Sequence, residues 1–260
     1  MLAAQYFDLK ARLANKAEPF LFSWMTMPGA QLAGQLARLP IEGVCLDLQH
    51  GMVGFSDAVP MIAAINNAGR PAIVRVLWNE PGIIGQTLDA GAGAVIVPMV
   101  NSRAQAEAMV RSAKYPPMGG RSWGGYTAFQ TFGLSPADYL KRANAMTLVF
   151  AMIETQAALD AVEDIASVPG LDGLFVGPSD LSIALSNGAG IDKTAPHTLE
   201  AMKRVEAAAR KNNLVAGAFA GTAEIIKTYF AMGYTFMAGI VDVDLLQAGA
   251  SSLLKAVKGV

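Results

Sequence analysis

The sequence has almost no cysteine: Cys45 is the only one among 260 residues. A single cysteine cannot form a disulfide within the chain, which is typical of proteins from a reducing compartment. Residues 1–12 carry acidic and basic side chains where a secretory signal peptide needs an apolar run. We therefore expect a cytoplasmic protein in which Cys45 is a small buried hydrophobic residue rather than a nucleophile.

Charge is also scarce, since Asp, Glu, Lys and Arg make up 16% of the residues and the formal net charge is −1. Lys and Arg form no cluster, which argues against a nucleic acid or an anionic membrane as the partner. The longest uncharged stretch, residues 19–37, is interrupted by Pro28 and by glycines, so we predict a strand, a loop and a helix there rather than a membrane span. A small molecule is the partner that remains.

Hydrophobic residues make up 53% of the chain, which excludes disorder and predicts several buried strands. Segments with helical periodicity separate the apolar runs, and several of them end in Gly or Asn. Eight such runs recur, at residues 20–26, 43–48, 71–77, 93–99, 147–153, 172–177, 214–220 and 235–241.

This alternation predicts an α/β fold, namely a (β/α)₈ TIM barrel with a parallel eight-stranded sheet, in one domain spanning residues 1–260. An open doubly wound sheet is the alternative. The first strand, however, is not followed by the G-x-G-x-x-G turn that a dinucleotide site needs.

One connection, residues 115–135, is rich in Gly, Pro and aromatic residues and lacks periodicity. Such a segment is typical of a functional loop or lid. Packing is the alternative role for its aromatic side chains. The candidate contacts to an acceptor substrate are Arg121, Trp123 and Tyr126 in this segment, and Trp24 and Phe219 in strands.

Charged residues occur at the ends of several predicted strands, where an ionised group is costly unless it is paired or binds a metal. Carboxyl ends of strands form the face on which barrel enzymes carry their active sites. For any one residue a structural ion pair is an equally good explanation, but five on one face indicate a shared polar site. They are Asp47, His50, Arg75, Glu154 and Asp180. The second histidine, His197, follows Pro196 at a predicted helix start, and we expect it on the surface.

The set has a chemical interpretation. Glu154 and Asp180 are hard oxygen ligands that suit Mg²⁺ or Mn²⁺ and leave coordination positions open for a 2-oxo acid. Arg75 would face the keto oxygen, where negative charge grows on enolisation. His50, oriented and kept basic by Asp47, is the candidate general acid/base.

The turn formed by Gly177, Pro178 and Ser179 precedes a helix whose first N–H groups could bind a substrate carboxylate. A Schiff-base lysine is disfavoured, because every lysine falls in a predicted helix or loop. A phosphorylated substrate is disfavoured as well, since Asp242 and Asp244 follow the eighth strand, where barrels often bind phosphate.

Six blocks, taken in order, resemble the HpcH/HpaI aldolases, the class II pyruvate aldolases. They are LDLQHG (46–51), IVRVLWNEP (73–81), TLDAGAGAVIVPMV (87–100), YPPMGGRSWG (115–124), MIET (152–155) and GLFVGPSDLS (173–182). The resemblance implies a (β/α)₈ barrel, a divalent metal ion (Mg²⁺, Mn²⁺ or Co²⁺), and reversible aldol addition or cleavage between a 2-oxo acid and an aldehyde.

Matched position by position, the resemblance assigns the metal ligands to Glu154 and Asp180, the enolate-binding arginine to Arg75, and the acid/base dyad to Asp47 and His50. It also implies a homo-hexamer, built as a trimer of dimers with an exchanged C-terminal helix. In such an assembly Asp89 would approach the active site of a neighbouring subunit.

Two positions depart from the family's pattern, because Gln49 stands where many members have Glu, and Met152 where they have Gln. The Gln form resembles members assigned to hydroxypyruvate or sugar-acid chemistry. We predict a metal-dependent aldolase with pyruvate or hydroxypyruvate as donor. The alternatives are an acyl-CoA lyase, a 2-oxo acid decarboxylase and a catalytically silent 2-oxo acid binding protein. The lyase is disfavoured because this sequence has no basic patch for the CoA diphosphate, and the binding protein because it would not need His50.

Overall fold

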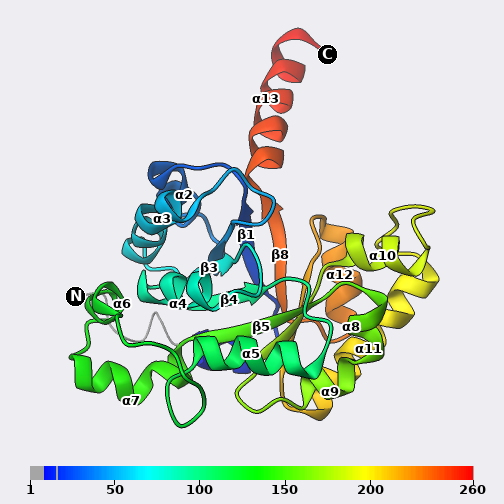
Figure 1. The fold of residues 1–260 in the computed structure, drawn as a ribbon. Helices are drawn as coiled ribbons and strands as arrows, with labels where there is room; N and C mark the ends of the chain where they lie inside the picture. The colour runs from blue at the N-terminus through cyan, green and yellow to red at the C-terminus, as the bar shows by residue number, and fades with distance from the viewer. Residues whose placement is uncertain (1–8, 16, 260) are drawn as a thin grey trace.

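In a computed structural model that describes residues 9–15 and 17–259, eight parallel strands close into a barrel (Figure 1). Each strand pairs with the next along the chain, and the eighth pairs with the first. The strands are β1 (Phe20–Met25), β2 (Gly43–Asp47), β3 (Ala72–Arg75), β4 (Ala94–Val97), β5 (Leu148–Ile153), β6 (Gly173–Val176), β7 (Val215–Phe219) and β8 (Phe236–Val241). The predicted barrel and all eight predicted strands are confirmed.

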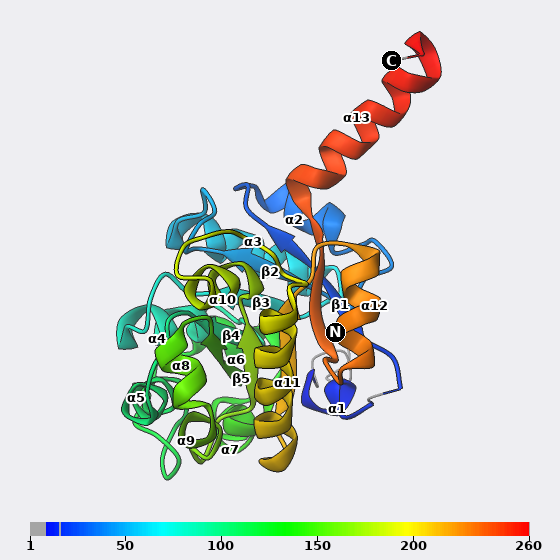
Figure 2. The ribbon, with the colours of Figure 1, turned by 90° about the vertical axis from the view of Figure 1, so that its right-hand side faces the viewer.

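Helices surround the barrel (Figure 2). Those that precede β5 are α1 (Leu9–Ala14), α2 (Ala30–Leu36), α3 (Phe55–Asn67), α4 (Pro81–Asp89), α5 (Arg103–Ala113), α6 (Tyr126–Thr131) and α7 (Pro136–Met146). Those that follow are α8 (Gln156–Asp160), α9 (Val162–Ala166), α10 (Pro178–Leu185), α11 (Pro196–Lys211), α12 (Ala223–Ala231) and α13 (Asp242–Lys258). No helix in the described part of the chain is both long and apolar enough to cross a membrane.

An aromatic cluster fills the inside of the barrel. The Phe236 ring lies 4.5 Å from that of Phe22 and 4.6 Å from that of Phe150, measured between centroids. Gly173 and Gly217 make room for these rings, because a Cβ at Gly173 would overlap Phe150 and one at Gly217 would come within 2.8 Å of Phe175. Rings packed this closely fill the barrel beneath the carboxyl ends of the strands, the face on which barrel enzymes bind their ligands.

The connection at residues 115–135 is not a structureless loop, because it contains α6. Its aromatic side chains pack against one another: Trp123 stacks on Phe129 at 5.7 Å, and Phe129 lies 5.7 Å from Tyr139 of α7. The sequence showed no helical periodicity here because the buried rings face a local cluster rather than one apolar stripe along a long helix.

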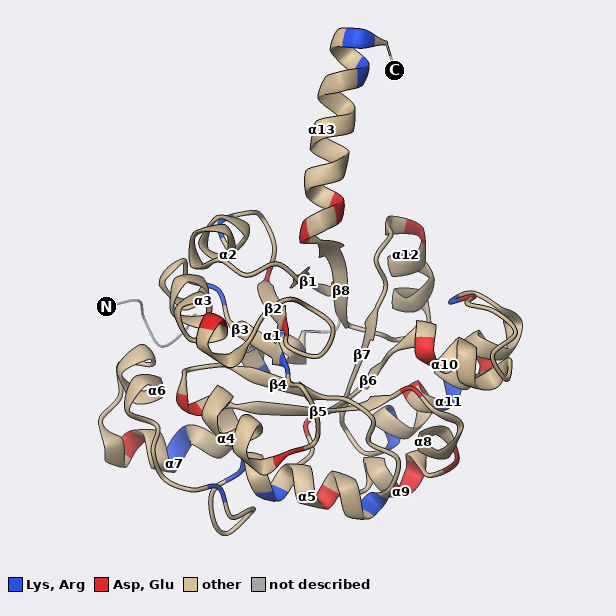
Figure 3. Cartoon of the chain, turned by 45° about the horizontal axis from the view of Figure 1, so that its top comes forward, with Lys and Arg blue, Asp and Glu red and all other residues tan. Residues whose placement is uncertain are grey.

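The last helix, α13, extends away from the barrel (Figures 1 and 2). Only Asp242, its first residue, is buried. Its acidic residues lie at the barrel end and its lysines at the far end, with no charge in the long stretch between them (Figure 3). The exposed apolar residues of that stretch and of the tip are Leu245, Leu246, Leu253, Leu254 and Val257.

The aromatic interior predicts that Gly173→Ala destabilises the protein, because the new methyl group overlaps the Phe150 ring. We expect the free energy of unfolding to fall by about 1–3 kcal/mol, the usual cost of overpacking. Urea denaturation measures this. Gly85→Ala, in open space on α4, is the matched control and should raise stability slightly. Equal stability of the two variants would contradict the packing.

Candidate active site

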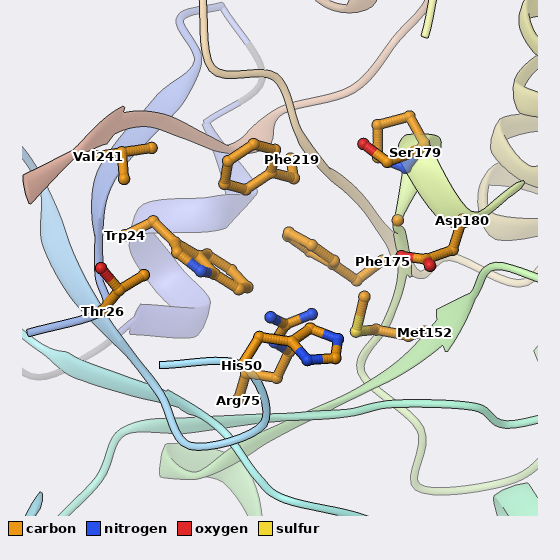
Figure 4. A pocket seen from close by; sticks show the side chains of 12 residues that line it. Trp24, Thr26, His50, Arg75, Met152, Phe175, Ser179, Asp180, Phe219 and Val241 are labelled. Carbon is orange, nitrogen blue, oxygen red and sulfur yellow. The ribbon is translucent and has the colours of Figure 1, made fainter. Parts of the chain in front are cut away.

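A cavity of about 300 Å³ opens at the carboxyl ends of the strands (Figure 4). It combines a few polar groups with an apolar wall, as small-molecule sites do. Its lining residues are Trp24, Thr26, His50, Arg75, Met152, Phe175, Gly177, Pro178, Ser179, Asp180, Phe219 and Val241.

A buried ion pair between Asp47 and Arg75 lies at the base of this cavity. The two residues are direct partners in the β2–β3 register. Arg75 donates from Nε to Oδ1 at 2.8 Å and from Nη2 to Oδ2 at 2.6 Å, and Trp24 donates from Nε1 to Oδ2 at 3.1 Å. The guanidinium carbon also lies 4.8 Å from the centroid of the Trp24 ring. Such a bidentate contact fixes the plane of the arginine.

The electrostatics of Asp47 follow from this contact. Burial alone would raise the pKa of Asp47, but the hydrogen bonds and charge of Arg75, with help from the His50 N–H and from Trp24, lower the pKa below its ordinary value. The carboxylate is therefore ionised, and the pair is held together by a full charge–charge contact.

The sequence predicted that Asp47 orients the His50 ring, but among the described residues no hydrogen bond joins the Asp47 carboxylate to the imidazole. The carboxylate accepts the backbone N–H groups of Gln49 at 3.1 Å and His50 at 3.2 Å, and its other donors in the described part of the chain are Trp24 and Arg75. The turn is tight, because a Cβ at Gly51 would overlap the Asp47 carbonyl oxygen. Asp47 thus orients the backbone from which His50 projects, while the imidazole itself is exposed and lines the cavity.

Asp180 lies on the opposite side of the cavity from Trp24 (Figure 4), and its charge acts on Glu154. Glu154 follows β5 directly, is buried, and accepts the N–H of Met99 at 2.7 Å on Oε1. Burial raises the pKa of Glu154, the Met99 N–H opposes this, and the nearby charge of Asp180 raises it further. Two carboxylates that destabilise each other's charge are stabilised together by a cation.

These residues fit a divalent metal ion. A Cβ at Gly177 would come within 2.7 Å of Glu154 Oε2, so only glycine leaves the space beside that oxygen free. Within the described residues no group of three Asp, Glu, His or Cys side chains could hold a metal. Glu154 and Asp180 would therefore be the only protein ligands among these residue types, and further positions would be left to substrate and water, as is usual for Mg²⁺.

The turn of Gly177, Pro178 and Ser179 lines the cavity as α10 begins. Trp24 and Phe219 also line it, their rings edge to face at 5.3 Å. Cys45 is buried, and burial raises the pKa of its thiol, so its placement agrees with the predicted hydrophobic role. None of the lysines that the structure describes lies on a strand.

Three predicted substrate contacts and Asp89 lie elsewhere in this chain. Arg121 is buried and binds Asp89 through Nη2 at 2.6 Å, in a separate hollow between α4 and α5. Trp123 and Tyr126 belong to the aromatic cluster around α6. None of these side chains lines the cavity at the strand ends.

Sequence reasoning missed Thr26, Phe175 and Val241 as lining residues. Each lies at or next to the end of a strand, and this position could have identified it from the sequence as a lining residue. Asp242, which follows β8, accepts the N–H groups of Thr26 at 2.9 Å and Met27 at 2.8 Å. Asp242 therefore holds the loop after β1 in place rather than facing the cavity.

The Asp47–Arg75 pair yields a stability prediction. Arg75→Met leaves the Asp47 carboxylate buried without its main partner, so we expect the free energy of unfolding to fall by about 3–5 kcal/mol. Adding Asp47→Asn removes the buried charge and should restore part of the loss. Urea denaturation of both single variants and the double variant measures the coupling.

Arg103→Met, which breaks an exposed pair with Glu107, is the control and should cost less than about 1 kcal/mol. Strictly additive losses would show that the pair is not coupled.

Comparisons with known proteins identify the family of this chain. The family model for HpcH/HpaI aldolase/citrate lyase matches residues 21–248. The hydroxypyruvate/pyruvate aldolase of Rhizorhabdus wittichii is 34% identical over 92% of this chain and 94% of its own length. The 2-dehydro-3,6-dideoxy-6-sulfogluconate aldolase of Pseudomonas putida is 33% identical over 92% of this chain and 92% of its own length.

The crystal structure of an HpcH/HpaI aldolase/citrate lyase family protein from Burkholderia cenocepacia superimposes with a TM-score of 0.87 at 32% identity, over 97% of this chain and 99% of that one. The resemblance predicted from the six sequence blocks is confirmed, and the chain belongs to the HpcH/HpaI aldolase/citrate lyase family.

Proposed function

We propose that the protein is a metal-dependent class II aldolase that joins pyruvate or hydroxypyruvate to an aldehyde, reversibly. The observation that carries this proposal is the placement of Arg75, fixed by Asp47 and Trp24, in the same cavity as Asp180, whose charge acts on the buried Glu154. The relatives named above are aldolases, and one of them carries hydroxypyruvate and pyruvate in its name. The activity class is thus an aldehyde-lyase of the family, and the donor is our proposal.

Glu154 and Asp180 would hold the divalent ion, which we propose to be Mg²⁺ or Mn²⁺, with Co²⁺ as a substitute. When bound, such an ion supplies Lewis-acid polarisation of the donor's keto group. The chain's own contribution is that Gly177 leaves room beside Glu154 and that the start of α10, near Ser179, offers N–H groups to the donor carboxylate.

Arg75 would stabilise the enolate oxygen. Two of its three guanidinium nitrogens bind Asp47, and Nη1 has no hydrogen-bond partner among the described residues. Because Arg75 lines the cavity, Nη1 is available to donate to the keto oxygen of the donor. That oxygen gains negative charge as the C3 proton leaves or as the C3–C4 bond of an aldol breaks, so the contact strengthens on the way to the transition state.

His50 would move the proton. In the cleavage direction its imidazole removes the proton of the C4 hydroxyl, the C3–C4 bond breaks, its electrons form the enolate, and the aldehyde leaves. The enolate then takes a proton at C3. The exposed imidazole at the cavity wall suits this role, and the Asp47 contact to the His50 backbone fixes the position from which it acts.

Exchange of donor protons for deuterium tests the proposal. The C3 protons of pyruvate and hydroxypyruvate should exchange in D₂O with Mn²⁺ or Mg²⁺ present and not after EDTA treatment, as followed by proton NMR. Glu154→Gln should lower the metal-dependent rate by at least about 100-fold, because loss of a ligand exceeds the usual effect of changing an outer contact.

His50→Ala serves as the matched comparison. It should keep metal-induced thermal stabilisation while lowering aldol turnover by roughly 10²–10⁴-fold, the scale of a positioned acid/base. Exchange that survives EDTA, or full activity of Glu154→Gln, would refute the metal role. No exchange with either donor would instead favour an acyl-CoA lyase, a decarboxylase or a silent binding protein.

We further propose that the protein acts in the cytoplasm as a homo-hexamer, a trimer of dimers in which α13 is exchanged between partners. The helix buries only Asp242 against its own barrel, while Leu246, Leu253 and Val257 share one face by helical spacing. In such an assembly Asp89, held by Arg121, would face the cavity of a neighbouring subunit.

Charging this face should therefore break the assembly. The double variant Leu246→Asp, Leu253→Asp should shift the mass found by light scattering from that of a hexamer to a smaller species, because two charges would be desolvated at the interface. Ser251→Asp, on the opposite face of α13 by helical spacing, is the control and should keep the assembly. A monomeric wild-type protein would refute the proposal.

A further inference from the structure

The first residue of α13, Asp242, carries a carboxylate that is buried, with 2% of the residue exposed. Its Oδ2 accepts the backbone N–H groups of Thr26 at 2.9 Å and Met27 at 2.8 Å. Its Oδ1 accepts the Thr26 hydroxyl and the N–H of Val243, both at 2.9 Å. No lysine, arginine or histidine in the described part of the chain forms an ion pair with it. The carboxylate is therefore satisfied by directed hydrogen bonds, most of which fix the loop that follows β1.

Thr26 connects this carboxylate to the cavity. It is a lining residue, and Figure 4 shows it beside Trp24, on the side of the cavity away from Asp180. The N–H and the hydroxyl of Thr26 both bind Asp242. Its carbonyl oxygen accepts the N–H of Met52 at 2.8 Å. One residue thus joins the base of α13 to the turn that follows β2.

The turn that follows β2 carries His50, and the backbone of Thr26 packs against this turn. A Cβ at Gly51 would come within 3.0 Å of the Thr26 carbonyl oxygen and 3.1 Å of its Cα. On one side of the imidazole, the N–H of His50 itself binds the Asp47 carboxylate at 3.2 Å. Two residues later, the N–H of Met52 binds Thr26. The segment from which the imidazole projects is therefore held at both ends.

The two ends of this segment are held in different ways. Asp47 is fixed by Arg75, inside the site. Thr26 is fixed by Asp242, which is not one of the lining residues of the cavity. A segment that is held at one end only can rotate about that end, and a displacement of about 1 Å in an active site can lower the rate by about 100-fold. The position of His50 thus depends on a carboxylate outside the cavity.

We propose that Asp242 is a positioning residue of the active site, which holds the turn of His50 through Thr26. The proposal rests on the acid/base role of His50 given above, and it gives the first residue of α13 a part in catalysis. Because α13 begins at Asp242 and extends away from the barrel, a shift of its first turn is passed through Thr26 to the turn that carries the imidazole.

Replacement of the carboxylate by an amide tests this. Asp242→Asn keeps the size of the side chain but replaces one acceptor oxygen by an NH₂ donor, which cannot accept the N–H groups now bound there. We expect kcat for aldol cleavage to fall about 10- to 100-fold. KM should change less than kcat. The affinity for Mn²⁺, measured by isothermal titration calorimetry, should stay the same, because Asp180 lies on the other side of the cavity from Thr26.

A double-variant cycle with His50→Ala separates this positioning role from a general structural one. If Asp242 acts through His50, Asp242→Asn should cause no further loss of kcat in the His50→Ala background, because the group that it positions is absent. Equal losses in the two backgrounds, or no loss in the wild-type background, would overturn the proposal while leaving the aldolase function intact. Full turnover of His50→Ala alone would instead refute the acid/base role on which the proposal rests.

Asp244→Asn is the matched control, because Asp244 is exposed in the same turn of α13. It should leave kcat unchanged, and an equal loss there would count against the Thr26 contact. Thr26→Val, which removes only the hydroxyl bond to Asp242, carries the same cycle if Asp242→Asn does not fold. It should lower kcat in the wild-type background alone, and Thr26→Ser should restore it. A loss for Thr26→Val that persists in the His50→Ala background would overturn the proposal.

Discussion

The candidate site depends on the buried contact between Asp47 and Arg75. A lone arginine at the base of an aromatic barrel would be costly, and the carboxylate at the end of the adjacent strand compensates its charge. The bidentate geometry also fixes the guanidinium plane, with Trp24 against one face. The same carboxylate holds the turn that carries His50. One ion pair thus positions both polar groups on this side of the cavity.

The barrel around the pair determines where chemistry can occur. Gly173 and Gly217 admit aromatic rings that fill the interior, and the cavity that holds Arg75 and Asp180 lies above them at the carboxyl ends of the strands. Gly177 has a related effect, because its missing Cβ leaves space beside Oε2 of the buried Glu154. The charge of the exposed Asp180 beside the buried Glu154 then makes this space favourable for a cation, while the start of α10 makes it favourable for an anion nearby.

Several features were predictable from sequence because they depend on local chemistry. Apolar runs of strand length, separated by amphipathic helices, have few ways to bury their surface other than a parallel barrel. Charged residues at strand ends were predictable as a group, because all carboxyl ends of a parallel barrel meet on one face. Asp47, Arg75 and Glu154 were found in this way, and each is buried in the structure.

The partners of those residues were not predictable. Asp47 is three positions from His50 in sequence, yet its carboxylate binds Arg75 on the adjacent strand, since the β2–β3 register places the two side chains together. Arg121 looked like a substrate contact because it lies in a long glycine-rich connection, but that connection folds onto α4 and pairs it with Asp89. The sequence by itself determined the barrel, its strands and the face that carries the site, since these follow from periodicity and burial. Only the tertiary structure decided which charge meets which, because pairing depends on register and packing between strands rather than on distance along the chain.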